Sequence, residues 1–184
     1  MGVEFNKTQI KGSFPVFWRG EFKVLPGDFK VTTDLPDGTV VKRGTPILID
    51  FARMECKICK AIKVVAGGDT TNPRIEKGSL VKTTEQVGGQ AINAIDTSNP
   101  DYDVLTLAAA VSGATGGKIL AVSSDVPNAV VESDTTISSK MGFNTVSAGY
   151  DGVVLKDVAY PVADDWLESG YCLKKNHSIK YIRQ

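Results

Sequence analysis

Turns and short apolar strands alternate through the stretch DLPDGTVVKRGTPILIDF at residues 34–51. Pro36 presets the backbone angle φ, and the Asp37-Gly38 pair that follows it tolerates positive φ. A turn is therefore predicted at these residues. A strand is expected at residues 39–42, a second turn at 43–46 and an apolar strand at 47–51. Because the strands are this short and the turns this closely spaced, the stretch indicates a β-rich body.

The composition of the whole chain agrees with this interpretation. Valine, isoleucine and threonine make up about a quarter of the 184 residues, and these β-branched side chains pack well on sheets. Eighteen glycines and eight prolines divide the chain into short segments. The sequence therefore predicts an all-β fold, a small barrel or a sandwich, with one or two short helices and an extended N-terminal arm.

Segments outside residues 34–51 give weaker signals. Phe51, Met54 and Ile58 lie at helical spacing after a possible cap at Asp50, which favours a short helix over 51–57 and then a strand over 59–66. The remaining expectations are a strand running into a helical turn at 103–111, an exposed loop-rich stretch at 122–150, strands at 153–155 and 158–160, a helical turn at 164–166 and a final strand at 178–182.

The first 28 residues differ from the rest of the chain. Together with Phe29 they hold six of the fourteen aromatic residues, and prolines and glycines interrupt them. We interpret residues 1–28 as an extended arm and residues 29–184 as a single β-rich domain. The arm either wraps its own domain or docks onto a partner. For docking, Trp18-Arg19 is the preferred anchor, since Trp and Arg are enriched at interface hot spots.

Charge and targeting signals narrow the class of protein. Twenty-one basic and twenty-one acidic residues give a net charge of zero, which argues against binding to nucleic acid or an anionic membrane. The sequence shows neither a signal-peptide pattern nor an apolar run of the roughly 20 residues that a membrane-spanning helix needs. Three cysteines, an odd number, do not indicate a disulfide framework, so synthesis in a reducing cytosol is expected.

Few residues suggest chemistry. Cys56 and Cys59 form one CxxC motif, and His177 is the only histidine. A redox role is one reading, and zinc held by both cysteines with Cys172 and His177 is another. The more ordinary reading is that the cysteines are small buried hydrophobes. No nucleophile-elbow or phosphate-loop motif occurs. We therefore expect no enzyme activity, no cofactor and no metal.

Five stretches carry a resemblance to a known family. They are GSFPVFWRG (12–20), LPDGTVVKRGTP (35–46), AGG (66–68), EKG (76–78) and SIKYI (178–182). Together they resemble head-fibre and capsid-decoration proteins of phages, in particular those of Bacteroides-like gut bacteria. Such a resemblance implies a non-enzymatic structural protein on the outer capsid surface of a tailed phage, often trimeric, with a β-rich body and an arm that contacts the major capsid protein.

Longer head fibres continue into a shaft and a tip, neither of which this sequence contains, so a decoration protein or a fibre base that stabilises the shell is expected. The homotrimer would present three arms to one lattice point, with capsid contacts at Phe14, Phe17, Trp18, Arg19 and Phe22. The alternative is a surface module that recognises a host glycan or protein through loops 123–150, where Tyr150 and the nearby Tyr160 are the aromatic candidates.

Overall fold

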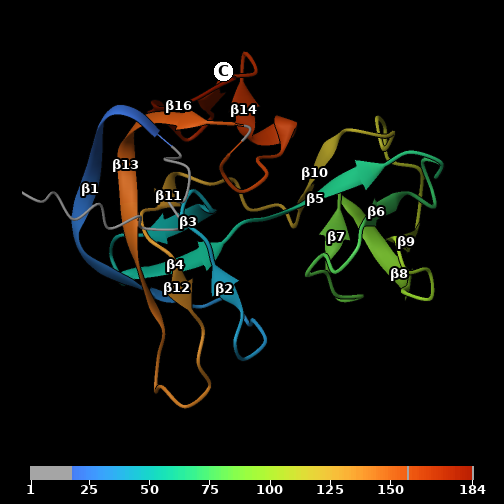
Figure 1. The fold of residues 1–184 in the computed structure, drawn as a ribbon, viewed down its shortest axis with the longest axis horizontal. Coiled ribbons are helices and arrows are strands. Elements are labelled where there is room, and N and C mark those ends of the chain that lie inside the picture. Colours follow the sequence, from blue (N-terminus) through green and yellow to red (C-terminus); the bar gives the residue numbers. More distant parts are fainter. Residues whose placement is uncertain (1–17, 157, 184) are drawn as a thin grey trace, which may run out of the picture.

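The computed structural model describes residues 18–156 and 158–183, and within them the chain is almost all β. The predicted all-β class is therefore confirmed. Figure 1 shows two bodies, one built around a long, strongly bent sheet and the other a compact barrel. The strands of the first body are β1 (Trp18–Val31), β3 (Pro46–Asp50), β4 (Glu55–Ile58), β11 (Ala129–Val131), β13 (Thr145–Leu155), β14 (Leu167–Glu168), β15 (Cys172–Leu173) and β16 (Asn176–Ile182).

Five strands of the first body close into a ring. The order of the sheet is β1-β4-β3-β11-β13-β16-β15-β14, and β1 pairs a second time, with β13. The ring is therefore β1-β4-β3-β11-β13, with the β1–β4 pairing parallel and the others antiparallel. Each of these strands contributes side chains to one apolar core, which includes Phe29, Ile47, Cys56, Val131 and Val146.

The second body is a closed six-stranded barrel in the order β10-β5-β6-β9-β8-β7. In the sequence, the six barrel strands follow β4 and precede β11, and both β4 and β11 pair with β3 of the first body. The barrel is therefore an insertion into the first body. Its core includes Val64, Ile75, Leu105 and Val122. The predicted unit 29–184 thus contains two closed strand systems. The barrel strands are β5 (Lys60–Val65), β6 (Arg74–Glu76), β7 (Gln86–Val87), β8 (Gln90–Asp96), β9 (Tyr102–Leu107) and β10 (Ile119–Val122).

A third apolar cluster joins the two bodies. It takes Ala61 and Ala121 from the barrel, Val130 and Val154 from the ring, and a C-terminal group centred on the 3-10 helix η1 (Asp164–Trp166). The indole of Trp166 is the largest fully buried side chain of the described residues. The helical turn predicted at 164–166 is thereby confirmed, and it supplies the residue that fills the junction.

Two predicted elements are wrong. The expected helix over 51–57 is a single turn followed by β4, because Met54 takes a left-handed backbone with φ of 52°. The side chain of Asp50 does cap this turn, accepting hydrogen bonds from the amides of Ala52 (3.0 Å) and Arg53 (3.2 Å). The expected strand over 158–160 is also a turn, in which the amides of Val158 and Ala159 both donate to the carbonyl of Leu155.

The other predicted elements differ less from those in the structure. The stretch 103–111 begins as strand β9 but has no helical turn among its described residues. The loop-rich stretch 122–150 contains β11, half of β13 and β12 (Thr135–Thr136), which pairs with β2 (Val40–Val41). The final strand predicted at 178–182 is confirmed within β16.

The predicted arm boundary at residue 28 falls inside β1. From Trp18 to Lys30 this strand pairs with β13, interrupted by several register shifts. The ring of Phe22 lies against the backbone of Gly149 and Gly152 in β13, where any added Cβ atom would overlap it. Glycine on β13 therefore makes room for an aromatic side chain from β1, which fixes the two strands to each other.

Replacing Gly149 with alanine should destabilise the protein by about 1–3 kcal/mol, the usual cost of overpacking. Either Phe22 leaves its site or the two strands move apart, since the methyl group overlaps the phenyl ring. Urea unfolding measures the change. Gly142→Ala is the matched control, because nothing lies within 4 Å of a Cβ atom there. Equal stability of the two variants would show that the contact does not hold the strands.

Candidate functional site

The residues proposed for capsid contact divide between two parts of the chain. Phe14 and Phe17 lie outside the described residues. Trp18 and Phe22 lie on β1, stack with ring centroids 5.2 Å apart and pack against the junction cluster around Trp166. Both are half-buried, whereas Arg19 is exposed. Trp18 and Phe22 therefore contribute to the packing of their own sheet.

The CxxC motif does not bring its cysteines to one site. Cys56 belongs to the core of the five-stranded ring, and Cys59 belongs to the junction cluster. Burial raises the pKa of each thiol to about 12. Neither thiol forms a disulfide. Cys56 and Cys59 therefore pack in two separate apolar clusters, which fits the reading of these cysteines as small buried hydrophobes.

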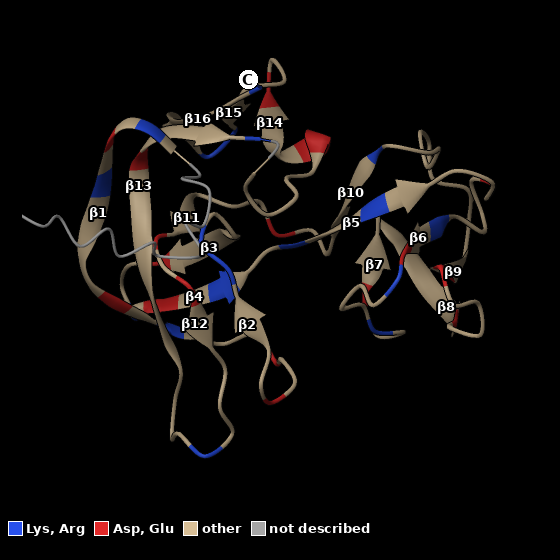
Figure 2. Cartoon of the chain, viewed as in Figure 1, with Lys and Arg blue, Asp and Glu red and all other residues tan. Residues whose placement is uncertain are grey.

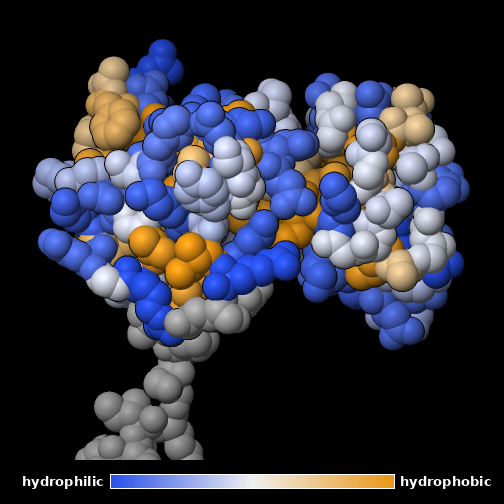
Figure 3. Space-filling model, turned by 90° about the horizontal axis from the view of Figure 1, so that it is seen from above, coloured by the Kyte–Doolittle hydropathy of each residue, from blue (hydrophilic) through white to orange (hydrophobic). Residues whose placement is uncertain are grey.

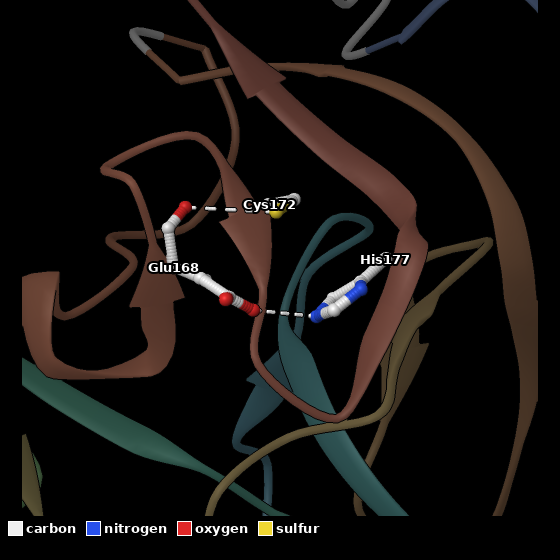
Figure 4. Close-up of side chains that lie close together, drawn as sticks. All are labelled: Glu168, Cys172 and His177. Atoms are coloured by element: carbon white, nitrogen blue, oxygen red, sulfur yellow. Dashed lines mark hydrogen bonds and ion pairs between the residues drawn. The ribbon is translucent and has the colours of Figure 1, made fainter.

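The third cysteine lies in a different setting. The carboxylate of Glu168, the thiol of Cys172 and the imidazole of His177 each have a potential metal-ligating atom within 4.8 Å of the other two. They come from three adjacent antiparallel strands, β14, β15 and β16, and in Figure 4 dashed lines join Glu168 to each of the other two. The Nε2 atom of His177 lies 2.6 Å from the Glu168 carboxylate, and the Cys172 thiol donates to the Glu168 backbone carbonyl at 3.5 Å.

Cys172 and His177 are candidate ligands in the sequence, whereas Glu168 was not predicted. The signal for it was the Ser169-Gly170 dipeptide, which has φ of 52° and 77° and turns the chain so that Glu168 pairs with Cys172 across the hairpin. Cys172 is buried, whereas the side chains of Glu168 and His177 are 55% and 64% exposed. The cluster therefore has a fixed thiol and two side chains that are able to change rotamer.

A cleft of about 560 Å³ lies between the two bodies, and its lining combines apolar and charged side chains. Basic side chains line it from both sides, and at least two of them are paired. Lys63 is 2.9 Å from Glu76, and Lys77 is 2.7 Å from the buried carboxylate of Asp103. Tyr160, one of the predicted glycan contacts, also lines this cleft. These ion pairs satisfy the charges of Lys63 and Lys77 within the protein.

The most exposed large hydrophobic side chains of the described residues are Met141 and Phe143, at 61% and 60%. They lie in the loop at residues 137–144, which projects from the lower end of the first body in Figure 1. Hydrogen bonds hold its base: the Asn144 side chain accepts from the Ser138 amide at 2.8 Å, and Asp37 accepts from the Ser139 amide at 2.6 Å. A fastened loop thus presents two apolar side chains to solvent.

The rest of the surface is mixed. Basic and acidic residues are interspersed in both bodies (Figure 2). On the face seen from above, small hydrophobic patches lie between hydrophilic residues (Figure 3). Among the described residues, no helix has the length and apolar character to span a membrane.

Comparison with known proteins gives no match. No family model fits the chain, and neither the curated proteins nor the solved structures contain one that is significantly similar to it.

The two buried thiols of the CxxC motif should be inert in the folded protein. With a pKa of about 12, the thiolate fraction at pH 8 is on the order of 10⁻⁴, and it is the thiolate that reacts. Alkylation of the Cys172→Ala variant, followed by mass spectrometry, should label neither cysteine in buffer and both in denaturant. Rapid labelling of the folded variant at pH 8 would contradict the burial of these thiols.

Proposed function

We propose that this protein is a non-enzymatic structural protein of a tailed-phage virion, which binds the outer capsid surface as a decoration protein or head-fibre base and stabilises the shell. The observation that carries the proposal is where the resembling stretches lie. Residues 18–20 begin β1, residues 35–46 run through β2 to the start of β3, and residues 178–182 are in β16. The resemblance thus falls on residues that build the all-β frame.

The packing of β1 narrows the proposed docking segment. Trp18 and Phe22 stack and pack on their own sheet, so residues 1–17, with Phe14 and Phe17, become the principal capsid contact, beside the exposed Arg19 on β1. Three arms of a homotrimer would bind one lattice point with an avidity about 10²- to 10⁴-fold above that of one arm. The net charge of zero suits a location outside the shell, away from packaged DNA.

A second candidate function has one specific observation in its favour. The exposed Met141 and Phe143 lie within the loops proposed for host recognition, whereas Tyr160 lines the cleft between the two bodies. A methionine and a phenylalanine favour contact with a protein over contact with a glycan, because they offer apolar area without hydrogen-bonding groups. Recognition of a host protein through this loop is compatible with attachment to the capsid.

Co-sedimentation with capsids tests the attachment. Capsids assembled from the major capsid protein of the same genome should pellet the full chain. A variant lacking residues 1–17 should bind them at least about tenfold more weakly, since it loses the arm contacts that add through avidity. Deleting residues 1–28 is the poorer experiment, because it removes most of β1 and its pairing with β13.

Two controls separate the outcomes. The truncated chain should unfold at the same urea concentration as the full chain, because β1 remains complete. Met141→Ser/Phe143→Ser should pellet as the full chain does, since this loop is not the proposed capsid contact. Equal binding by the truncated chain would exclude the arm, and failure of the full chain to pellet would refute the capsid role.

The oligomeric state is a separate prediction. Light scattering coupled to size-exclusion chromatography should give a mass about three times the 19.7 kDa of one chain. Because a symmetric trimer matches three arms to one lattice point, a stable monomer at micromolar concentration would remove the avidity argument. Single-arm binding would then have to account for any capsid attachment.

A further inference from the structure

Three different metal-binding groups converge at one edge of the first body. Glu168, Cys172 and His177 lie within a segment of ten residues, on three strands that end the eight-stranded sheet. A carboxylate, a thiol and an imidazole are the three side-chain types that bind Zn²⁺ in proteins. Figure 4 shows the Glu168 carboxylate pointing toward the imidazole, with Cys172 beside them.

The spacing of these groups is close to what a zinc ion requires. Zinc–ligand bonds of about 2.0–2.3 Å in tetrahedral geometry place ligand atoms roughly 3.3–3.8 Å apart. The three potential ligand atoms already lie within 4.8 Å of one another, and the contact between Glu168 and His177, at 2.6 Å, has only to open slightly. Both of these side chains are more than half exposed, so rotamer changes can supply the adjustment.

The backbone around the cluster is fixed. The Glu168 and Cys172 backbones are held by the hairpin, in which they pair directly. The residue before His177 is anchored as well: the Asn176 side-chain amide donates to the carbonyls of Asn128 at 2.9 Å and Tyr150 at 2.8 Å. A ligand set on rigid strands needs little reorganisation to bind, which favours affinity.

We propose that Glu168, Cys172 and His177 form a zinc site in which the Cys172 thiol binds as thiolate and releases its proton to solvent. Three protein ligands leave a fourth position for water. The soft thiolate selects zinc over magnesium or calcium, which prefer oxygen ligands alone. The set replaces the combination considered from the sequence, since Cys56 and Cys59 belong to other clusters and Glu168 takes part instead. It does not depend on a capsid role.

Calorimetric titration of the reduced, EDTA-treated full chain with Zn²⁺ tests the proposal. We expect one equivalent to bind, and Co²⁺ in its place to show the charge-transfer absorption of a thiolate ligand. Glu168→Gln and His177→Gln should each weaken zinc binding at least about tenfold, and Cys172→Ser more. Because the first two change exposed side chains, they test the site without disturbing the core.

Cys56→Ala is the matched control, since it removes a thiol of the chain that lies outside the cluster. This variant should bind one equivalent of Zn²⁺ with an affinity within about twofold of that of the unaltered chain, because Cys56 is not a ligand of the proposed site. Absence of saturable binding by the full chain would overturn the proposal. Unchanged affinity in both Glu168→Gln and His177→Gln would do the same, because the metal would then be held by some other group.

Discussion

The packing of the two bodies against each other depends on the burial of one indole ring, that of Trp166. Trp166 is 2% exposed and lies in a cluster that draws residues from the barrel, from the ring and from the C-terminal strands. Truncating a buried tryptophan typically costs about 3–5 kcal/mol, a large part of the stability of a small protein. The ion pair of Lys82 with Asp34 and the hydrogen bond from the Tyr160 hydroxyl to the Ala61 carbonyl also link the barrel to the first body. The C-terminal segment therefore forms part of the surface against which the inserted barrel packs.

A second constraint acts within the ring. β1 closes the five strands by pairing with β13, and Phe22 fits over two glycines of that strand. Phe22 also stacks with Trp18, so both rings contribute to the packing of β1 against its own sheet. In the sequence, Trp18 and Phe22 resemble docking anchors. In the structure, they help to hold β1 against β13. Only position relative to β13 separates the two roles.

Local signals were sufficient for much of the fold. The β-branched composition, the turn at Asp37-Gly38, the helical turn at Trp166 and the final strand could all be predicted, since each depends on neighbouring residues. The helix over 51–57 was mispredicted because Asp50 caps a turn that Met54 ends with a positive φ. Closure of two strand systems and the meeting of Glu168 with His177 depend on pairings between distant strands or across a hairpin, which apolar periodicity does not encode.

The register of β13 links the candidate features of the first body. Val154 pairs with Trp18 of β1 on one side and with Tyr181 of β16 on the other. The proposed arm therefore enters the sheet two strands away from the strand that carries His177. Metal bound across β14, β15 and β16 would restrain the edge of this sheet, where the two short strands have few ladder hydrogen bonds of their own. Restraint there acts on the sheet from which the arm starts, because β13 is paired to both β1 and β16.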